Sequence, residues 1–468
     1  ISMSVATAGE CDGVLLSVRS EPDQLEGGKV EYVERRGAIC ADLTIGPNVA
    51  GANRLASNAV ISCPGVKLFG QGFVVDLDKA IALGLNRSEG LSLHLRPYLT
   101  AREVTQEPRN RYAMDFLGLT SDQVKDAFPE CYQHLCDYVR PERKQNNRKS
   151  YRDNWWLFGE PRKVFRTTLR GLTEQIITPE TSRHRFFTTC PIETIVEGTL
   201  VVIASDQPEV LGVLSSRPHE LWALSSGSRL GVGNDPRYNK TRCFETFPFP
   251  VTDAQAKKRI GHLAEQLDAH RKRQQEKHPK LTMTGMYNVL EKLRSQRSLN
   301  AKEQVIHEQG LVSVLKQIHD DLDAAVFDAY GWPHDLDDEA ILHRLVELNH
   351  ERADEEGRGL IRWLRPEFQN PDGATQTAFD NESTKKKAKK ATAKIKKQPW
   401  PKSLPDRMVA IQNALQRHGT PADVRQVAAY YTRANKDNVA ELLETLAAVG
   451  NVRQIEDGRY VSMQTKAG

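Results

Sequence analysis

Two short runs of the chain concentrate side chains that can contact nucleic acid. Residues 182–187 read SRHRFF, and residues 234–250 read NDPRYNKTRCFETFPFP. In both runs, cationic side chains alternate with aromatic rings and amides. Lysine and arginine pair with phosphates, and a forked guanidinium matches a guanine edge. The two runs therefore predict a DNA-contacting surface made of Arg183, His184, Arg185, Arg237, Tyr238, Lys240 and Arg242.

The spacing of these cations indicates how they are presented. Arg183 and Arg185 alternate at a predicted junction of strand and loop, so they can share one face. Residues 237–242 follow a turn rich in Gly, Asn, Asp and Pro, which favours a loop of fixed shape. Forked arginine gives base specificity and lysine gives phosphate affinity, and the sequence leaves open which residue does which.

A second basic segment precedes these runs. Residues 140–152 contain six lysines and arginines. We expect Trp155 and Trp156 to lie in the core, because paired large aromatic residues anchor mixed domains. The cations on either side should stay exposed and contact DNA: Arg148, Lys149, Arg152, Arg162, Lys163 and Arg166.

These elements together resemble a known family. Residues 148–166 (RKSYRDNWWLFGEPRKVFR), the SRHRFF run, residues 233–250 and residues 278–294 (HPKLTMTGMYNVLEKLR) are similar to the C-terminal half of single-chain bacterial DNA adenine-N6 methyltransferases of the type II restriction–modification kind. The likeness covers roughly residues 1–371. It implies a target recognition domain followed by a helical spacer, with double-stranded DNA as partner and S-adenosylmethionine as cofactor of the whole enzyme.

The catalytic motifs of such enzymes do not stand in this chain. The family's amino-activating motif contains a Pro-Pro dipeptide beside an aromatic residue that stacks on the flipped base, and the sequence has no Pro-Pro dipeptide. Residues 69–73 (FGQGF) are similar to the cofactor loop, yet no acidic residue follows on a second strand. A glycine turn before a strand is the ordinary explanation. We expect no catalytic or cofactor-binding residue here.

Nuclease and metal chemistry are predicted absent as well. Asp23, Glu26 and Lys29 suggest a metal-dependent nuclease site, but their spacing is too short for a hairpin to converge them on a metal. Cys131 and Cys136 lack a partner pair, and the histidines form no cluster of metal-ligand spacing.

Composition describes an ordinary protein with local basic density. It is 39% hydrophobic and 27% charged, with a net charge of +4. Residues 385–397 hold eight lysines and no acid, which fits either a solvated linker or contact with DNA. Seven scattered cysteines favour a reducing bacterial cytoplasm. No apolar run nears the length of a membrane span.

Periodicity predicts an α+β chain. Alternating residues over 1–75 indicate short strands. A helix should start at Ser121 as N-cap and run towards Arg140. Strands return at 174–178 and 200–205, and helical spacing sets in at 253.

We therefore expect four parts. A mixed α/β target recognition domain should span 1–250, and a helical spacer domain 251–368. A lysine-rich disordered linker should follow at 369–402. Three short helices and an Asp-Gly hairpin then indicate a winged-helix-like module over 403–464. Its core should hold Val424, Val427, Leu442, Leu443, Leu446 and Val449.

The sequence thus favours the DNA-recognition portion of a methyltransferase whose catalytic half lies upstream, in a longer chain or a separate one. A free-standing DNA-binding protein without a catalytic partner is the alternative, and a catalyst with unfamiliar motifs is a third. The coding sequence upstream of Ile1 would separate the first two.

Overall fold

The computed structural model divides the chain into two compact units, residues 1–377 and 378–468. The structure describes the following residues: 12–20, 31–37, 39–40, 45–230, 235–371, 398–401, 403–418, 422–428, 430–432, 434–448, 452–454 and 460–462. Most of the expected lysine-rich linker lies outside these ranges. No helix among the described residues is long and apolar enough to cross a membrane.

The first unit is built around two four-stranded sheets. In one, the strand order is β3 (Ser62–Pro64), β10 (Leu200–Ile203), β7 (Glu174–Pro179), β8 (Thr188–Pro191), and all neighbours are antiparallel. Every residue of β10 is buried, as its continuous apolar run predicts.

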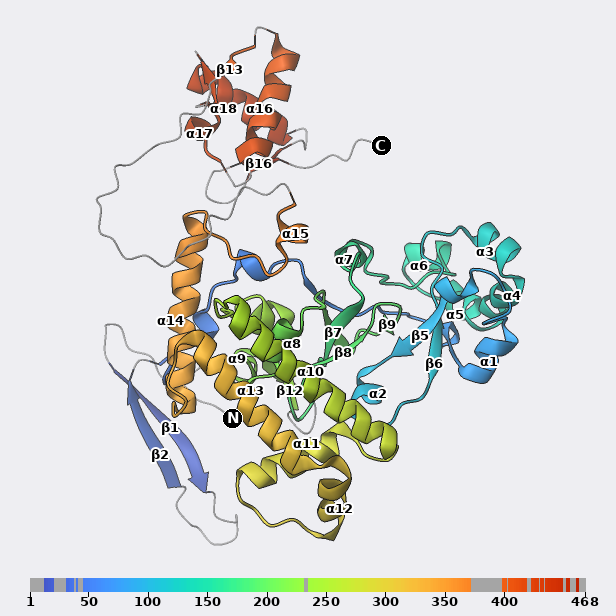
Figure 1. The fold of residues 1–468 in the computed structure, drawn as a ribbon. Coiled ribbons are helices and arrows are strands. Elements are labelled where there is room, and N and C mark those ends of the chain that lie inside the picture. The colour runs from blue at the N-terminus through green and yellow to red at the C-terminus, as the bar shows by residue number, and fades with distance from the viewer. Residues whose placement is uncertain are drawn as a thin grey trace. The chain divides into compact units, whose positions relative to one another are not determined.

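The second sheet has the order β4 (Val74–Asp76), β6 (Arg111–Met114), β5 (Leu95–Leu99), β9 (Ile195–Val196). The short strand β9 pairs parallel to β5, whereas the other pairs are antiparallel. Since β8, β9 and β10 follow one another along the chain, one continuous segment belongs to both sheets. This segment holds the sheets against each other (Figure 1).

Three helices cover the second sheet where one long helix was expected. Helix α3 (Ser121–Ala127) is followed by α4 (Pro129–Tyr138) and α5 (Arg140–Lys144). The N-cap of α3 is Thr120, whose side chain accepts from the backbone N–H of Gln123. The expected N-cap at Ser121 and the continuous helix were therefore wrong. Pro129 has no N–H and fits only the first turn of a helix, so it starts a new one.

Shorter elements complete this part of the first unit, together with an antiparallel hairpin near its start. They are β1 (Gly13–Ser20), β2 (Glu31–Gly37), α1 (Leu77–Ala82), α2 (Ala101–Thr105), α6 (Lys149–Asp153), α7 (Lys163–Thr168), α8 (Pro208–Leu214), α9 (Arg217–Ser226), β11 (Ser228–Leu230) and β12 (Asp235–Arg237).

Five helices continue the first unit after residue 250. They are α10 (Ala254–Lys277), α11 (Met283–Arg294), α12 (Ala301–Gly310), α13 (Val312–Tyr330) and α14 (Asp338–Gly357), and the short α15 (Pro366–Gln369) follows. With the sheets, they confirm a mixed α and β fold.

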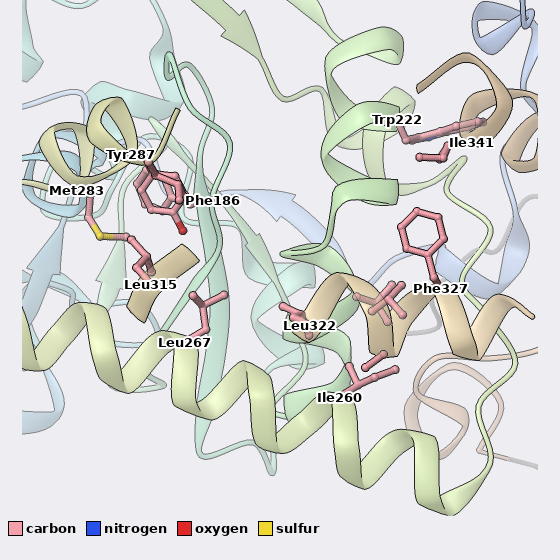
Figure 2. Packing of buried hydrophobic residues seen from close by; sticks show 14 of the residues in the cluster. Phe186, Trp222, Ile260, Leu267, Met283, Tyr287, Leu315, Leu322, Phe327 and Ile341 are labelled. Atoms are coloured by element: carbon pink, nitrogen blue, oxygen red, sulfur yellow. The ribbon is translucent and has the colours of Figure 1, made fainter. Parts of the chain in front are cut away.

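The helices share one hydrophobic core with the preceding segment. Phe186 and Trp222 pack with Ile260, Leu267 and residues of α11, α13 and α14 (Figure 2). Trp222 is fully buried, and burying a side chain of this kind stabilises the fold by a few kcal/mol, roughly 1.5–3 for a large apolar residue. The helices therefore help to hold the residues 180–250 in place.

The second unit contains α16 (Leu404–His418), α17 (Val424–Ala428), α18 (Lys436–Ala448) and an antiparallel hairpin of β15 (Val452–Gln454) and β16 (Tyr460–Ser462). A short parallel pair joins β13 (Gln398–Pro399) to β14 (Tyr431–Thr432). Of the expected core, Val427, Leu442, Leu443 and Leu446 are buried and Val424 is partly buried. Val449 lies outside the described residues.

Candidate nucleic-acid interface

The structure brings together the two runs that the sequence singled out. The backbone N–H of Ser182 donates to the carbonyl of Pro236 at 3.2 Å, and that of Tyr238 donates to Glu180 at 2.6 Å. The Arg237 guanidinium reinforces this pairing through two hydrogen bonds to the Glu180 carboxylate, at 2.7 and 3.0 Å. We call residues 180–185 and 235–242 the recognition loops.

Two residues expected to contact DNA are instead buried under these loops. Arg185 is 6% exposed and Tyr238 is 1% exposed. The Arg185 guanidinium donates to the Thr178 hydroxyl at 2.8 Å and to the carbonyls of Pro179 and Pro236, and it lies over the Tyr238 ring. Their assignment to the DNA surface is therefore corrected: both residues hold the loops together.

The layer beneath the loops is made largely of aromatic side chains. The Tyr238 hydroxyl is 3.0 Å from Nε2 of His219, which is fully buried. Burial, with the nearby Arg185 charge, lowers the pKa of His219 to about 3, so this imidazole is neutral at physiological pH. Phe187 and Phe247 pack their rings against it. Such a layer favours loops of fixed shape.

Three arginines of the loops project towards solvent. The side chain of Arg183 is 62% exposed, that of Arg237 is 37% exposed, and Arg242 is exposed. Lys240 forms an ion pair with Glu245, so its charge is already neutralised. The expected common face of Arg183 and Arg185 is not found, because one side chain points outward and the other is buried.

Helix α11 supports the first recognition loop from one side. Nε2 of His184 is 2.8 Å from the Asn288 amide oxygen, and Arg183 is 3.5 Å from the Glu291 carboxylate. His184 is half-buried, and burial lowers its pKa, so it is not an exposed cation near neutral pH.

A buried ion pair fastens the chain just after this loop to α10. Arg271, 1% exposed, donates to the carbonyl of Phe187 at 2.6 Å and to Asp268 at 3.0 Å. Asp268 also accepts from the hydroxyl of Thr188 at 2.6 Å. Burial works to raise the pKa of the Asp268 carboxyl, but Arg271 and Lys272 outweigh it and hold the pKa below its usual value. The carboxylate is thus charged and fully bonded.

The second basic segment divides into an exposed and an inward-facing group. Arg148, Lys149 and Arg152 are exposed on and beside α6, and Lys163 is exposed on α7. These four can meet a phosphate backbone. Helix α6 lies near α4 and α5, which cover the second sheet (Figure 1), whereas Phe165 of α7 packs against residues of the first sheet. Trp155, at 8% exposed, is in the core as expected.

Arg162 and Arg166, in contrast, are tied to acids of the same unit. Arg162 forms an ion pair with Glu160 at 2.9 Å and donates to the carbonyl of Gly65 at 3.0 Å. Arg166 forms an ion pair with the buried Asp115. Neither offers an open surface to a duplex, so their expected role in backbone contact is corrected.

Comparison with known proteins identifies what this arrangement resembles. Residues 68–251 match the family described as MmeI, target recognition domain. This segment is similar to a DNA target recognition domain. The match contains both recognition loops and the second basic segment, and it confirms the resemblance that the sequence indicated.

Two further likenesses agree with it. The structure of the type IIL restriction–modification enzyme MmeI in complex with DNA shares the fold, with a TM-score of 0.55 at 17% identity, over 74% of this chain and 42% of that one. The "DNA methyltransferase A" of Bacillus subtilis (strain 168) is 31% identical over 100 residues, which are 20% of this chain and 11% of that protein. The chain therefore spans less than half of each of these two proteins.

The MmeI-like segment includes the glycine motif at residues 69–73, and the structure explains its glycines by packing. A Cβ on Gly72 would lie 2.6 Å from Cβ of Tyr138, and one on Gly70 would lie 3.2 Å from the Phe73 ring. Phe73 is fully buried and leads into β4. The motif is a close approach of backbone to α4, so packing accounts for its glycines.

An exposed cation that the sequence did not predict for the interface adjoins the second recognition loop. Arg229 stands on β11, opposite Pro236 of β12 in the antiparallel register, and it is exposed. Its pair with Pro236 is next to the Ser228–Arg237 pair in the register, which brings its backbone close to the second recognition loop. A strand-like SRL followed by Gly-Val-Gly-Asn is a hairpin signal that could have revealed it.

Proposed function

We propose that this chain is the DNA sequence-recognition part of a site-specific DNA adenine-N6 methyltransferase of a restriction–modification system. The observation that carries this proposal is the coincidence of the MmeI-like segment with two interlocked loops that present exposed arginines. Methyl transfer belongs, on this proposal, to an upstream catalytic domain or chain that binds S-adenosylmethionine. The protein acts on double-stranded DNA in the bacterial cytoplasm.

The recognition loops and the α6–α7 segment have different roles in this proposal. Arg183, Arg237 and Arg242 stand on loops whose shape is fixed from beneath, and a fixed guanidinium fork can discriminate base edges. Lys149 and Lys163 are exposed point charges on short helices, which suits backbone phosphates. The likeness to a part of a restriction–modification enzyme favours this reading over a free-standing DNA-binding protein.

Selection of bound duplexes from a random library tests recognition directly. The full chain should enrich one sequence motif. Arg242→Ala should relax that motif at one position, because an arginine that reads guanine contributes about 1–3 kcal/mol of discrimination. Lys149→Ala should leave the motif unchanged and weaken binding to all sequences alike. If the native chain enriches no motif, the recognition proposal fails.

The same selection distinguishes base reading from backbone contact. Arg183→Ala and Arg237→Ala are to be compared with Arg242→Ala. If all three variants keep the native motif and merely bind more weakly, the recognition loops contact only phosphates.

A methylation assay tests the division of labour. The purified chain, incubated with labelled S-adenosylmethionine and duplex DNA, should transfer no label, because residues 69–73 are occupied in packing. Label incorporated above a control without protein would contradict the placement of catalysis in another part.

A further inference from the structure

A cleft of about 350 Å³ opens where the two sheets of the first unit adjoin. Its walls come from β3, β9 and β10, from α7, and from the loop before β5. Its volume lies within the range of small-molecule sites, roughly 300–1,000 Å³. The close approach of the sheets depends on Gly65, because a Cβ there would lie 2.3 Å from the carbonyl oxygen of Val196.

The lining of this cleft is mostly apolar. Phe165 and Leu169 contribute from α7 and the residue after it, and Ile195, Val196 and Val202 contribute from the strands. Leu93, at the loop before β5, is 72% exposed. A flat ring fits apolar walls of this kind better than a bare ion does, because the ring can displace water from them.

Four arginines border the same cleft, against a single lining carboxylate, Glu193. Arg96 and Arg166 share one buried counter-charge, Asp115, at 3.6 Å from Arg96. Arg162 is paired with Glu160. The four arginines therefore carry more positive charge than the three nearby carboxylates neutralise.

Two guanidinium groups retain donors for a ligand. Nη2 of Arg166 is shielded from solvent and has no hydrogen-bond partner among the described residues. A buried donor without a partner costs about 1–3 kcal/mol, so an acceptor from a ligand would be favourable there. Arg170 is exposed at the edge of the cleft, and no ion pair or hydrogen bond of its guanidinium is found in the described part of the chain. An anionic group fits between these two side chains.

We propose that this cleft binds a nucleotide unit, with the base against the apolar walls and the phosphate at Arg166 and Arg170. The chemistry combines a planar ring with an adjacent anionic phosphate, and two sources offer it: a free mononucleotide, or an unpaired nucleotide of bound DNA. The proposal does not rest on the recognition function, since the cleft is distinct from the recognition loops.

Equilibrium dialysis of the full chain against labelled adenosine monophosphate tests the site. We expect saturable uptake of one nucleotide per chain, with inorganic phosphate and adenosine each binding more weakly. Arg170→Gln should weaken the nucleotide at least about tenfold, because it removes a charge-assisted hydrogen bond. The matched control is Lys125→Gln on α3, which removes an exposed charge outside the cleft and should change little.

A second pair of variants avoids any question of folding. Leu93 is exposed, so Leu93→Glu and Leu93→Gln should both fold. The glutamate should repel the phosphate and weaken nucleotide binding several-fold more than the isosteric glutamine. The proposal is overturned if uptake is not saturable, if phosphate alone binds as well as the nucleotide, or if Arg170→Gln and Lys125→Gln behave alike.

Competition with DNA distinguishes the two sources. If a duplex with one unpaired adenosine displaces the labelled nucleotide and the fully paired duplex does not, the ligand is an extrahelical nucleotide. If neither duplex displaces it, the ligand is a free nucleotide. A fully paired duplex that displaces it as well as the unpaired one does would reduce the site to backbone contact and sink the proposal.

Discussion

Replacing Arg271 by methionine removes the central member of the buried network that fastens Phe187 and Thr188, just after the first recognition loop, to α10. The native guanidinium is 1% exposed and reaches the Phe187 carbonyl, the Tyr287 hydroxyl and the Asp268 carboxylate, at 2.6, 3.0 and 3.0 Å. Methionine keeps most of the volume and none of the donors. The Phe187 carbonyl is then buried without this partner, and Asp268 keeps only Lys272 as counter-charge.

The expected cost follows from this burial. Breaking one partner out of a buried ion pair typically destabilises a protein by about 3–5 kcal/mol. We expect Arg271→Met to lower the free energy of unfolding of the first unit by that amount. The control is Arg259→Met in the same helix, whose ion pair with Asp328 is about half exposed on both sides. Exposed pairs contribute about 0–1 kcal/mol.

Urea unfolding followed by tryptophan fluorescence measures both variants. Five of the six tryptophans lie in residues 1–377, so the signal reports mainly on the first unit, and Trp400→Phe removes the remaining one. If the two variants lose the same stability, or if Arg271→Met loses less than about 1 kcal/mol, then burial of this pair does not fasten the loop as argued.

Three other outcomes are expected. Burial raises the pKa of Asp323 to about 7. The folded carboxyl therefore keeps a proton that the unfolded chain releases near pH 4. The stability that this proton contributes is lost as the pH rises from about 4 to about 7. Asp323→Asn, which keeps the acceptor for the Arg217 N–H, should flatten urea stability between pH 5 and 8, and equal slopes in both proteins would contradict this. Gly72→Ala should destabilise the first unit by about 1–3 kcal/mol through its contact with Tyr138; an unchanged urea midpoint would argue against the packing role. Deleting residues 385–397 should flatten the salt dependence of DNA binding by about 0.9 in log–log slope per lost phosphate contact, whereas an unchanged slope would make this segment a passive linker.

The elements that the sequence predicted well are those whose signal is local. The apolar run of β10 and the helical spacing of α10 are each explained by their own residues. The helical spacing was expected to begin at Asp253, and this residue is the N-cap of α10 and accepts from the Ala256 N–H. The parallel pairing of β9 with β5 could not be predicted from the sequence. It joins residues about one hundred positions apart, and β9 is only two residues long.

The residue types predicted which side chains of the interface are charged, but they did not predict which of these side chains are buried. Arg183 and Arg185 are two residues apart and chemically identical, yet one is exposed and the other is buried among carbonyl oxygens. What decides between them is the carbonyls of Pro179 and Pro236, which the fold brings to Arg185. Arg166 was misplaced for a similar reason, since its partner Asp115 precedes it by 51 residues.

The hydrophobic core that joins Phe186 and Trp222 to the helices after residue 250 limits how specificity can be exchanged between such proteins. If the segment before residue 250 were exchanged with that of another such protein, the recognition loops would be separated from the helices that pack against their segment. The hybrid would then have a poorly packed core. Exposed residues such as Arg183 and Arg242 are not part of this core, so they can be replaced one at a time without disturbing it. New DNA preferences should therefore arise more readily, in the laboratory and in evolution, by single changes on the loop surface than by recombination of whole segments.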